Sequence, residues 1–538
     1  MKIFGEERVN TFVAGSQSAS AAAGLAGGGY VVVWQSNLQD GSGEGVFAQR
    51  MDANGVGIGP EFRVNTSTNS SQSDPAVAGL PNGDFVVVWT DDVADGNSYG
   101  IYAQRFNSAG ASLGTEFRIN TQTSSTQYQP SVSAHNGGFV VTWTSYGQAG
   151  DPSSYGVFGS RFDMAGNVLQ SVGNNEFQVN TTTSNHQQES DVAAFADGSF
   201  VVVWRSEGQD TNSGGIYAQR FTSAGVKAGG EFLVNTFVAS NQFEPRVATL
   251  SDGTFVVVWT SASQDGSGNG VYAQRFQSDG TASGIEFRVN ESTVGGQYQP
   301  DVIGLSTGGF VVAWYNDNYE VGASGSYQDV YVREFSNAGV PVAGQVKANT
   351  PMATQTAQSE PVLADLSSGN YALMWTGGDN QDGSNNGIFQ QIFGEPADFN
   401  RQANPELGDF GGSVTFGENA VNAGFQVLDA AVSLTDSDSA DFGGGRVELF
   451  LVSGASVQDQ LGVRNQGVAP GEIGVSGSNV TYGGVVIGTM AGGVNGANLT
   501  IDLNTNASLG AVEALIQNLG YANTSSSPLE TRQVSVRV

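Results

Sequence analysis

Aspartates recur at one spacing along the chain and could bind a hard cation. Asp40, Asp95, Asp210 and Asp265 each stand six residues after a tryptophan, and Asp382 stands seven residues after one. Glycine-rich loops surround them, and calcium takes about six to eight oxygen ligands from carboxylates and from carbonyls of such flexible loops. Asp-Gly is also a preferred hairpin dipeptide. The pattern fits calcium ligands or plain turns, and both interpretations stay open.

A second acidic group lies nearer the C-terminus, in the segment "LTDSDSAD". It contains Asp436, Asp438 and Asp441, and Glu418 lies in a preceding "GEN" segment. Alternating aspartates can direct two carboxylates at one ion, so we expect calcium here, with a solvated loop as the alternative.

Catalytic residue types other than carboxylates are scarce. The chain has no cysteine and two histidines, His135 and His186, neither of which recurs in a neighbouring unit. Mechanisms based on Ser/His pairs or zinc therefore have little support. A glycosidase needs only a pair of carboxylates, and the 51 acidic residues leave that possibility open. We expect no enzyme, with a glycosidase or sialidase-like enzyme as the alternative.

The seven tryptophans reveal a repeat in which these residues are embedded. They stand at positions 34, 89, 143, 204, 259, 314 and 375, and each ends an apolar run such as "FVVVW". An aromatic segment such as "GVYAQRF", then "EFRVN", then a segment such as "QYQPSV" or "QYQPDV" follow, which gives four short strands per unit. Because the runs are apolar on both faces, we expect sheets packed face to face around an axis. The sequence predicts an all-β fold, a seven-bladed β-propeller over residues 1–397.

The N-terminus supplies the strand that the seventh unit lacks. The segment "FGEERVNT" at 4–11 matches "GPEFRVNT" at 59–66, whereas the seventh unit breaks off after "GIFQQIF". We expect the N-terminal strand to pair with the last unit and to close the ring, with an open array of hairpins as the alternative.

Acidic and basic residues also recur within the units. The acidic set is Glu61, Glu116, Glu176, Glu231 and Glu286, and the basic set is Arg50, Arg105, Arg161, Arg220 and Arg275. They form either a ring that binds substrate or, as we expect, cross-strand partners inside or between blades.

Residues 398–538 lack the repeat and read as a separate domain. Strand-like segments dominate, and "SLGAVEALIQNL" predicts one short helix with Val512, Leu515, Ile516 and Leu519 on one face and Gly520 as its stop. We expect a β-sandwich with one helix. The chain ends within a strand-like segment, so we expect the natural protein to continue past Val538.

The second domain resembles the cadherin-like modules of large secreted surface proteins of Gram-negative bacteria, the haemolysin-type calcium-binding or RTX proteins. The resemblance rests on "ENAVNAGFQVLDAAVSLTDSDSADFGGGRVELFL", "GVSGSNVTYGGVVIGTM" and "AVEALIQNLGYANTS", and the repeats are similar to segments of the same proteins. It implies type I secretion, calcium as cofactor and a role at the cell surface. The nonapeptide repeat that defines the RTX family is absent from the sequence.

Charge limits the partners. Twenty basic residues stand against 51 acidic ones, a net charge of −31, which repels nucleic acid and anionic membranes. No stretch is apolar enough to insert into a membrane, and the N-terminus has no apolar signal segment. Together with the resemblance, this predicts a secreted or cell-surface binding or structural module of a calcium-dependent adhesin, matrix or surface-layer protein. Its partner would be a glycan, a protein or a second copy of the chain. The alternative is a carbohydrate-active enzyme with its site on the propeller axis.

Overall fold

The structure is a computed structural model of the chain, and it separates into two compact units, Met1–Asp398 and Phe399–Val538. It describes residues 6–92, 98–148, 154–171, 175–210, 213–318, 327–349, 357–367, 369–378, 386–394, 406–408, 416, 418–435, 442, 445–453, 456–525 and 532–537.

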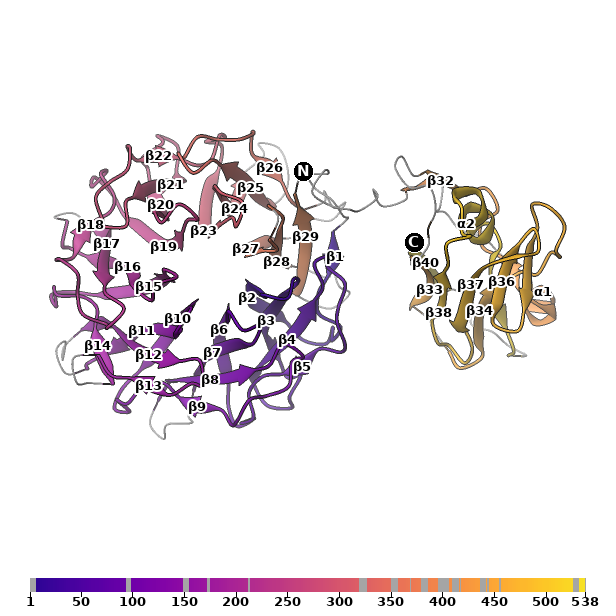
Figure 1. Cartoon of the computed structure of the whole chain (residues 1–538), viewed down its shortest axis with the longest axis horizontal. Helices are drawn as coiled ribbons and strands as arrows, with labels where there is room; N and C mark the ends of the chain where they lie inside the picture. The colour runs from indigo at the N-terminus through magenta and orange to yellow at the C-terminus, as the bar shows by residue number, and fades with distance from the viewer. Residues whose placement is uncertain are drawn as a thin grey trace. The chain divides into compact units, whose positions relative to one another are not determined.

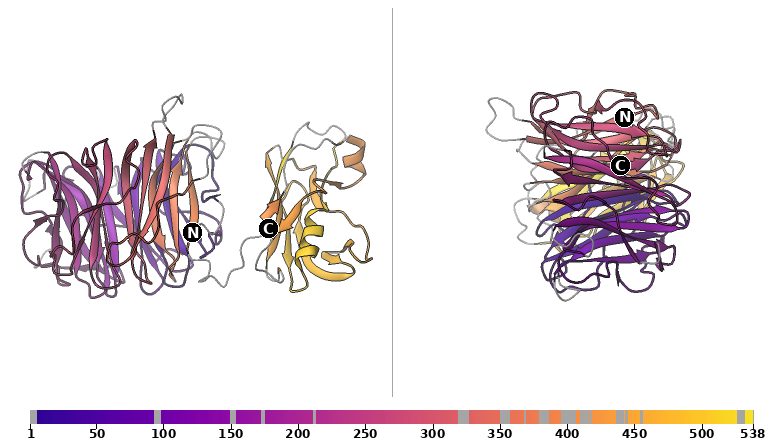
Figure 2. Two further views of the ribbon diagram at one scale, coloured as in Figure 1. Left: turned by 90° about the horizontal axis from the view of Figure 1, so that it is seen from above. Right: turned by 90° about the vertical axis from the view of Figure 1, so that its left-hand side faces the viewer.

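Antiparallel sheets make up the first unit. Its described residues form six sheets of four strands and one sheet of five. The sheets stand in a ring, each with one edge toward its centre (Figure 1). In the turned views of Figure 2 their strands run along the axis of that ring. Four-stranded sheets repeated around an axis define a β-propeller, so the all-β prediction is confirmed.

Each sheet presents its first strand to the axis and places the others successively outward. The innermost strands are β2 (Gln17–Gly24), β6 (Gln72–Gly79), β10 (Gln127–His135), β15 (Gln187–Ala194), β19 (Gln242–Thr249), β23 (Gly296–Gly304) and β27 (Gln358–Asp365). The second strands are β3 (Tyr30–Asn37), β7 (Phe85–Asp91), β11 (Gly138–Tyr146), β16 (Phe200–Glu207), β20 (Phe255–Ala262), β24 (Phe310–Asn318) and β28 (Tyr371–Gly377). The third strands are β4 (Glu44–Met51), β8 (Gly100–Phe106), β12 (Tyr155–Asp163), β17 (Gly214–Phe221), β21 (Asn269–Phe276), β25 (Tyr327–Phe335) and β29 (Gly387–Phe393). The outer strands are β5 (Phe62–Arg63), β9 (Phe117–Arg118), β13 (Val168–Leu169), β14 (Glu176–Gln178), β18 (Phe232–Leu233), β22 (Phe287–Arg288), β26 (Val346–Lys347) and β1 (Glu7–Arg8).

The second strands form the core because both of their faces are apolar. All seven tryptophans lie on them and are completely buried. Trp259 of β20 packs against Val201 and Val203 of β16 in the neighbouring sheet. This confirms the prediction that the apolar runs lie between sheets.

The N-terminal strand joins the sheet of the last repeat. Glu7 pairs with Gln390 of β29, and the Val9 N–H donates to the Ile388 carbonyl at 2.7 Å. The Asn10 side chain accepts from the Ile388 N–H at 2.8 Å, as Asn65 does from Val46 in the first repeat. The predicted pairing of the N-terminal strand with the last unit is therefore confirmed for residues 7–10, whereas residues 4 and 5 lie outside the described residues.

The second unit combines antiparallel sheets with two described helices, one more than the single helix predicted. The helices are α1 (Glu418–Ala423) and α2 (Leu509–Ile516). Helix α2 starts at the predicted place, where the Ser508 hydroxyl caps the Ala511 N–H, but it ends at Ile516, and Leu519 opens β39. Neither described helix is long and apolar enough to cross a membrane.

Three sheets contribute to this unit. They consist of β30 (Glu406–Gly408) with β32 (Ser433–Thr435); β31 (Gln426–Val427), β39 (Leu519–Asn523) and β34 (Asp459–Val463); and β35 (Ile473–Ser476), β36 (Asn479–Tyr482), β37 (Val485–Gly492), β38 (Leu499–Leu503), β33 (Arg446–Ser453) and β40 (Gln533–Arg537). They share one hydrophobic core with α2.

A buried carboxylate, Asp459, holds the end of the chain to this unit. It is fully buried and accepts hydrogen bonds from Tyr521 at 2.5 Å, from Asn523 at 2.6 Å and from the Arg532 Nε at 2.8 Å. Burial alone would raise the pKa of Asp459, but these donors outweigh it and hold the pKa below its ordinary value. Every partner belongs to the fold, so this carboxylate has a structural role.

Candidate functional site

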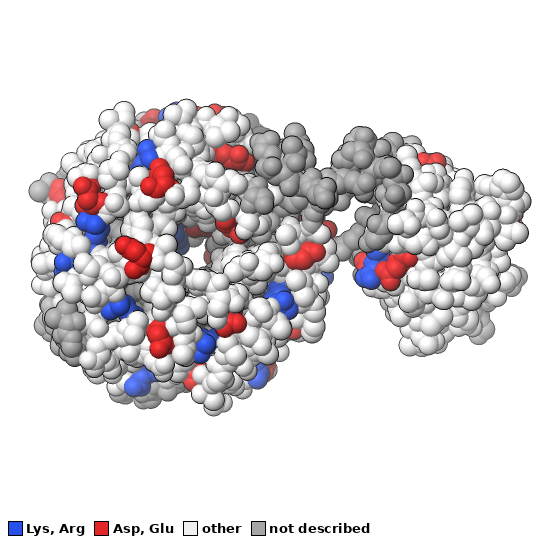
Figure 3. All heavy atoms as spheres, viewed as in Figure 1, with Lys and Arg blue, Asp and Glu red and all other residues white. Residues whose placement is uncertain are grey.

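A cavity of about 540 Å³ lies at the centre of the first unit, and the described residues that line it all belong to the seven innermost strands. Figure 3 shows the opening at the centre of the ring, with acidic and basic side chains inside it. Each sheet contributes one short segment to the wall of this cavity. The side chain at a given position of the repeat can therefore differ from sheet to sheet and give the wall a varied surface.

A bulge in every innermost strand shapes this cavity. The pairing with the second strand shifts in register, as between Ser73 and Ala76, and the residue at the bulge has a positive φ between 49° and 58° in all seven sheets. These bulge residues are Ala19, Asp74, Gln129, Glu189, Glu244, Gln299 and Glu360. L-residues rarely adopt this conformation, and a bulge re-directs the side chains around it.

Side chains at the bulge tie neighbouring sheets together. The Glu244 N–H donates to Glu189 at 2.9 Å, and the Gln299 N–H donates to Glu244 at 2.8 Å. The chain of contacts continues from the Glu360 N–H to Gln299 at 3.3 Å and from the Ala19 N–H to Glu360 at 2.8 Å. These groups therefore contribute to the assembly of the ring as well as to the cavity wall.

Two residues after the bulge, the type of side chain differs from sheet to sheet. The residues here are Ala21, Ala76, Ser131, Asp191, Arg246, Asp301 and Val362, and all of them line the cavity. They occupy equivalent places, opposite Val33, Val88, Thr142, Val203, Val258, Ala313 and Met374 of the second strands. We call Ser131, Asp191, Arg246 and Asp301 the polar arc, and Val362, Ala21 and Ala76 the apolar arc. The polar arc spans four adjacent sheets, and three of them carry a charged or titratable group, Asp191, Arg246 or Asp301.

The two aspartates of the polar arc are held differently. Asp191 accepts a hydrogen bond on each oxygen, from the Ser131 hydroxyl at 2.7 Å and from the Val247 N–H at 2.8 Å. Asp301 accepts on Oδ2 from the Leu363 N–H at 2.7 Å. Both carboxyls are therefore fixed against the cavity wall by the neighbouring sheet.

The pKa of Asp301 lies in the range that suits a general acid or base. Burial raises its pKa to about 6, and the charge of Asp191 acts in the same direction, whereas Arg246 and the Leu363 N–H oppose the rise. A carboxyl with this pKa holds a proton over part of the pH range near neutrality and can release it to a bound ligand. Perturbed acids of this kind in a cavity indicate a functional site.

The loop aspartates predicted as metal ligands are placed apart from this cavity. Asp40 accepts from the Ser42 N–H at 3.2 Å, and Asp265 accepts from the Ser267 N–H at 3.0 Å, which are turn contacts. Asp210 is buried in the corresponding loop of another sheet. In the part of the chain that the structure describes, no three His, Asp or Glu side chains form a metal-binding group.

The other predicted ligands lie largely outside the described residues. These are Asp95, Asp382, Asp436, Asp438 and Asp441; Glu418 lies at the start of α1, but its side chain is not described. Calcium binding at these positions stays a prediction.

The recurrent Glu and Arg residues join neighbouring sheets outside the cavity. The Thr66 N–H donates to Glu116 at 2.7 Å, and Arg105 donates to the Ala165 carbonyl at 2.6 Å, in each case across a sheet boundary. This agrees with the expected role as partners between blades.

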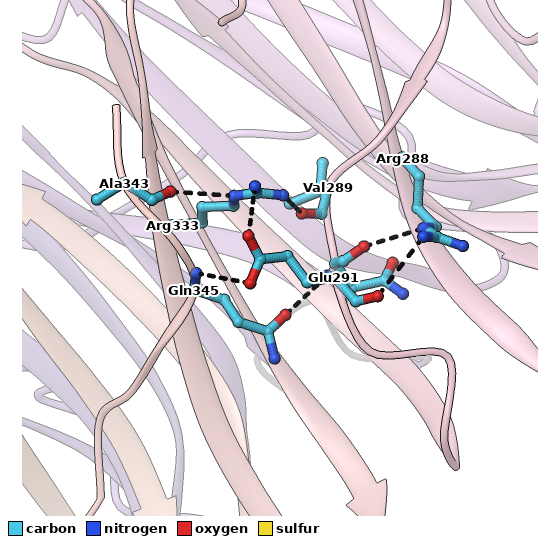
Figure 4. Close-up of polar contacts among 7 residues, drawn as sticks. Arg288, Val289, Glu291, Arg333, Ala343 and Gln345 are labelled. Carbon is cyan, nitrogen blue, oxygen red and sulfur yellow. Dashed lines mark hydrogen bonds and ion pairs between the residues drawn. The ribbon is translucent and has the colours of Figure 1, made fainter. Parts of the chain in front are cut away.

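One junction changes this pattern and compensates for the change. Glu291 stands where the other repeats have a threonine or similar residue, and it exchanges backbone–side-chain hydrogen bonds with Gln345 (Figure 4). Arg333 then forms an ion pair with Glu291 at 2.7 Å and donates to the Val289 carbonyl at 2.8 Å (Figure 4). The variation preserves the sheet junction, unlike the variation in the polar arc.

Comparison with known proteins gives structural similarity only. No protein-family description and no curated protein matches the chain. Among solved structures, the β-propeller domain of the Trilobed protease from Pyrococcus furiosus is similar at 9% identity and a TM-score of 0.42, over 71% of this chain and 96% of that one. The GH93 α-L-arabinofuranosidase of Fusarium graminearum, in complex with arabinobiose, is similar at 13% identity and a TM-score of 0.41, over 73% and 98%. The NanB sialidase from Streptococcus pneumoniae is similar at 10% identity and a TM-score of 0.39, over 74% and 71%.

The main functional prediction from the sequence is corrected here. An adhesin, matrix or surface-layer module without catalysis was expected, but the similar structures include an arabinofuranosidase and a sialidase. At these identities the similarity concerns the fold alone, so the carbohydrate-active alternative is taken up below as a proposal from the residues that line the cavity. The physical reason for the error is that the regularly placed aspartates lie in turns on different sheets. The titratable groups that face one common cavity lie on the innermost strands.

Asp191, Arg246 and Asp301 were missed by the sequence analysis although a signal was present. In the segments "SDPAVA", "YQPSVS", "QESDVA", "FEPRVA", "YQPDVI" and "SEPVLA", one column reads Ala, Ser, Asp, Arg, Asp and Val. This variation in side-chain type at one position of an otherwise regular repeat is the feature of the sequence that indicates these three residues.

Proposed function

We propose that the first unit is a carbohydrate-active propeller in which the axial cavity binds a glycan and the polar arc promotes hydrolysis of a glycosidic bond. The observation that carries this proposal is the placement of Asp191, Arg246 and Asp301 at equivalent positions of three adjacent sheets, facing one cavity. Alanine or valine stands at the equivalent position in three other sheets, so the repeat itself does not call for a charged residue there.

Asp301 is the proton donor in this proposal. Its carboxyl gives a proton to the glycosidic oxygen as the bond from that oxygen to the anomeric carbon breaks, and the leaving sugar departs as an alcohol. A pKa of about 6 makes the protonated form available at mildly acidic pH.

Asp191 supplies the second carboxyl that glycoside hydrolysis requires. Its hydrogen bonds from Ser131 and the Val247 N–H fix its position, and a negative carboxylate stabilises the positive charge that develops at the anomeric carbon. Water completes the reaction by adding hydroxyl to that carbon, and its other proton restores Asp301. Arg246 stands between the two aspartates in the order of the sheets and can donate hydrogen bonds to sugar hydroxyls.

Turnover of a panel of oligosaccharides tests the proposal. The intact chain should release sugar from at least one glycan, and Asp301→Asn should lower kcat by about 100-fold or more because general acid catalysis contributes roughly 10²–10⁴-fold. Asp279→Asn, in an exposed turn outside the cavity, serves as the matched control and should keep the wild-type rate. Equal rates for the wild type and Asp301→Asn would contradict the proposal.

The finer architecture belongs to the same proposal. We regard the seven sheets as the blades of one seven-bladed propeller that β1 closes, supported by the pairing of Glu7 with Gln390. The second unit is proposed to be a cadherin-like sandwich, supported by the common core of its sheets. Calcium binding and secretion stay predictions that rest on the resemblance.

A further inference from the structure

The motif "QYQP" occurs in two innermost strands, at 127–130 and at 297–300. In both cases its second glutamine, Gln129 or Gln299, is the bulge residue at the cavity. Four of the other five sheets carry Asp or Glu at the bulge, and the fifth carries Ala19. The two QYQP strands therefore place an uncharged amide, preceded by a tyrosine, where the rest of the ring is mainly acidic.

The tyrosine of the first motif starts an aromatic cluster that leads away from the cavity. The rings of Tyr128 and Tyr155 are 5.8 Å apart, and Tyr155 lies 5.0 Å from Tyr146 and 5.1 Å from His186. Tyr146 is 41% exposed. Burial and then the charges of Tyr155, Glu189 and Asp74 raise the pKa of Tyr128.

The second motif has a similar aromatic pair. The rings of Tyr298 and Tyr315 are stacked, with centroids 5.3 Å apart and planes at 18°. Burial and then the charge of Glu244, together with that of Glu360 among others, raise the pKa of Tyr315. Tyr128 and Tyr298 are both half-buried, and each stands one residue before a residue that lines the cavity.

The charge of the cavity wall restricts what such a ligand can carry. The acidic residues Asp74, Glu189, Asp191, Glu244, Asp301 and Glu360 line the cavity, and Arg246 is the one basic residue among the described lining residues. At neutral pH this wall repels a carboxylate-bearing sugar, whereas a neutral sugar is not affected.

We propose that the two QYQP strands, β10 and β23, form sugar subsites at the two ends of the polar arc, which select a neutral oligosaccharide over an anionic one. In each subsite the tyrosine stacks on the apolar face of a sugar ring, and the glutamine amide donates to and accepts from its hydroxyls. Gln129 is exposed at the bulge, so its amide is accessible to a ligand. This inference rests on the proposed glycan-binding function of the cavity and adds the class of glycan.

The structure offers a contrast inside the repeat that supports this assignment. At the bulges with a carboxylate, a second-strand hydroxyl donates to it, as Thr260 does to Glu244 and Thr376 does to Glu360, both at 2.8 Å. At the QYQP bulge of β23 the corresponding second-strand residue is Tyr315, which instead stacks on Tyr298. In this QYQP sheet an aromatic pair therefore stands where the sheets of Glu244 and Glu360 have that internal hydrogen bond.

Calorimetric titration of the intact chain tests the inference. The probes are neutral arabino-, xylo- and cello-oligosaccharides, and sialyllactose and oligogalacturonate as anionic ones. We expect one neutral series to bind and the anionic probes to bind at least tenfold more weakly. Tyr128→Ala and Tyr298→Ala should each raise Kd for a long neutral oligosaccharide about tenfold, which corresponds to ~1.4 kcal/mol.

Matched variants separate stacking from folding. Tyr128→Phe keeps the aromatic face and should bind within about twofold of the wild type. Ser73→Ala, at the corresponding position of the sheet β6–β9, should also leave Kd unchanged. If Tyr128→Ala has a lowered melting temperature, Gln129→Ala at the exposed bulge replaces it and should weaken binding several-fold.

The outcomes distinguish this inference from the function on which it rests. If neutral sugars bind and depend on Arg246 and Asp301 but not on the QYQP residues, or if anionic sugars bind as tightly, the subsite inference is wrong and the proposed function stands. If no oligosaccharide binds to the wild type, the proposed function itself is contradicted.

Discussion

The second strands and the innermost strands of the propeller differ in how much the repeat varies. The second strands read "YVVVW", "FVVVW", "FVVTW", "FVVAW" or "YALMW", and every one of their tryptophans is fully buried. The innermost strands share a bulge but carry Ala, Ser, Asp, Arg or Val two residues after it. A strand that packs on both faces permits few side chains, whereas a strand that faces a cavity permits many. Packing of the second strands therefore stabilises the ring, whereas the innermost strands can accommodate polar and charged side chains that take part in binding or catalysis.

The largest expected effect comes from replacing one side chain on each kind of strand by alanine and comparing the loss of stability. Trp259→Ala should lower the free energy of unfolding by about 3–5 kcal/mol, because it leaves a cavity between two sheets. Arg246→Ala, on the neighbouring innermost strand, should change it by less than about 1 kcal/mol because Arg246 is exposed to the axial cavity. Denaturant unfolding gives both values. Equal costs would mean that the innermost strand is as much a part of the core as the second strand.

Closure of the ring depends on a strand at the opposite end of the sequence from its partner. Deleting residues 1–11 removes the contacts of Val9 and Asn10 with the backbone of Ile388 and exposes the edge of β29. Two unpaired backbone groups cost about 1–3 kcal/mol each, so we expect a loss of about 3 kcal/mol and aggregation on heating. Tryptophan fluorescence reports this unit alone, since all seven tryptophans precede residue 376. An unchanged melting temperature in a soluble deletion variant would contradict closure.

Two aspartates with opposite pKa shifts extend the comparison to the second unit. The pKa of Asp459 is lowered in the folded state, so its contribution to stability is present above about pH 4 and is lost as pH falls through the folded pKa. Asp459→Asn should therefore destabilise the second unit by about 2 kcal/mol at neutral pH, since it loses the charge that pairs with Arg532.

The sign is reversed for Asp301. Its folded pKa of about 6 lies above the ordinary value of 3.8, so the stability that it contributes is present below about pH 4 and is lost as pH rises through 6. Asp301→Asn should raise the melting temperature of the first unit at pH 7 and have little effect at pH 4. Melting curves of both variants at the two pH values test these signs, and an Asp301→Asn variant that is less stable at pH 7 would assign Asp301 to the structure instead of the site.

Much of the fold could be predicted from the sequence because buried strands require apolar residues, and these recur at regular intervals along the chain. The apolar runs before each tryptophan predicted strands between sheets, and the match of 4–11 to 59–66 predicted the pairing of β1. The extent of α2 was less predictable, since Leu519 continues the apolar period of the helix but enters a strand. Helix α1 was not predicted, because its six residues are too few for a helical period to appear.

The candidate site was less accessible from the sequence. Asp191 and Asp301 are 110 positions apart in the chain and meet only because the ring brings their sheets around one axis. The bulge that directs them depends on residues with positive φ that are not glycine, such as Glu189 and Gln299, and no residue type marks that conformation reliably. The loop aspartates are easier to recognise because each stands six or seven residues after a tryptophan, but since each tryptophan belongs to a different sheet, each aspartate follows a strand of a different sheet.

The smallest effect is expected from calcium at those loops. If Asp40, Asp210 and Asp265 bind calcium, millimolar calcium should raise the melting temperature of the first unit by about 1–2 °C more than sodium chloride of equal ionic strength. Magnesium should do less because it tolerates irregular oxygen cages poorly. Asp265→Asn should remove part of the difference. Equal shifts with calcium, magnesium and sodium would identify the loop aspartates as turn residues.

The central claim, that the polar arc of the axial cavity is a glycan site, is tested most directly by a crystal structure of the chain with a neutral oligosaccharide. The account predicts sugar density inside the cavity, with hydroxyl or glycosidic oxygens within hydrogen-bond distance of Asp191, Arg246 and Asp301, and a sugar ring on Tyr128 or Tyr298. Sugar bound only on the outer surface of the propeller or on the second unit, with the axial cavity holding solvent alone, would contradict it.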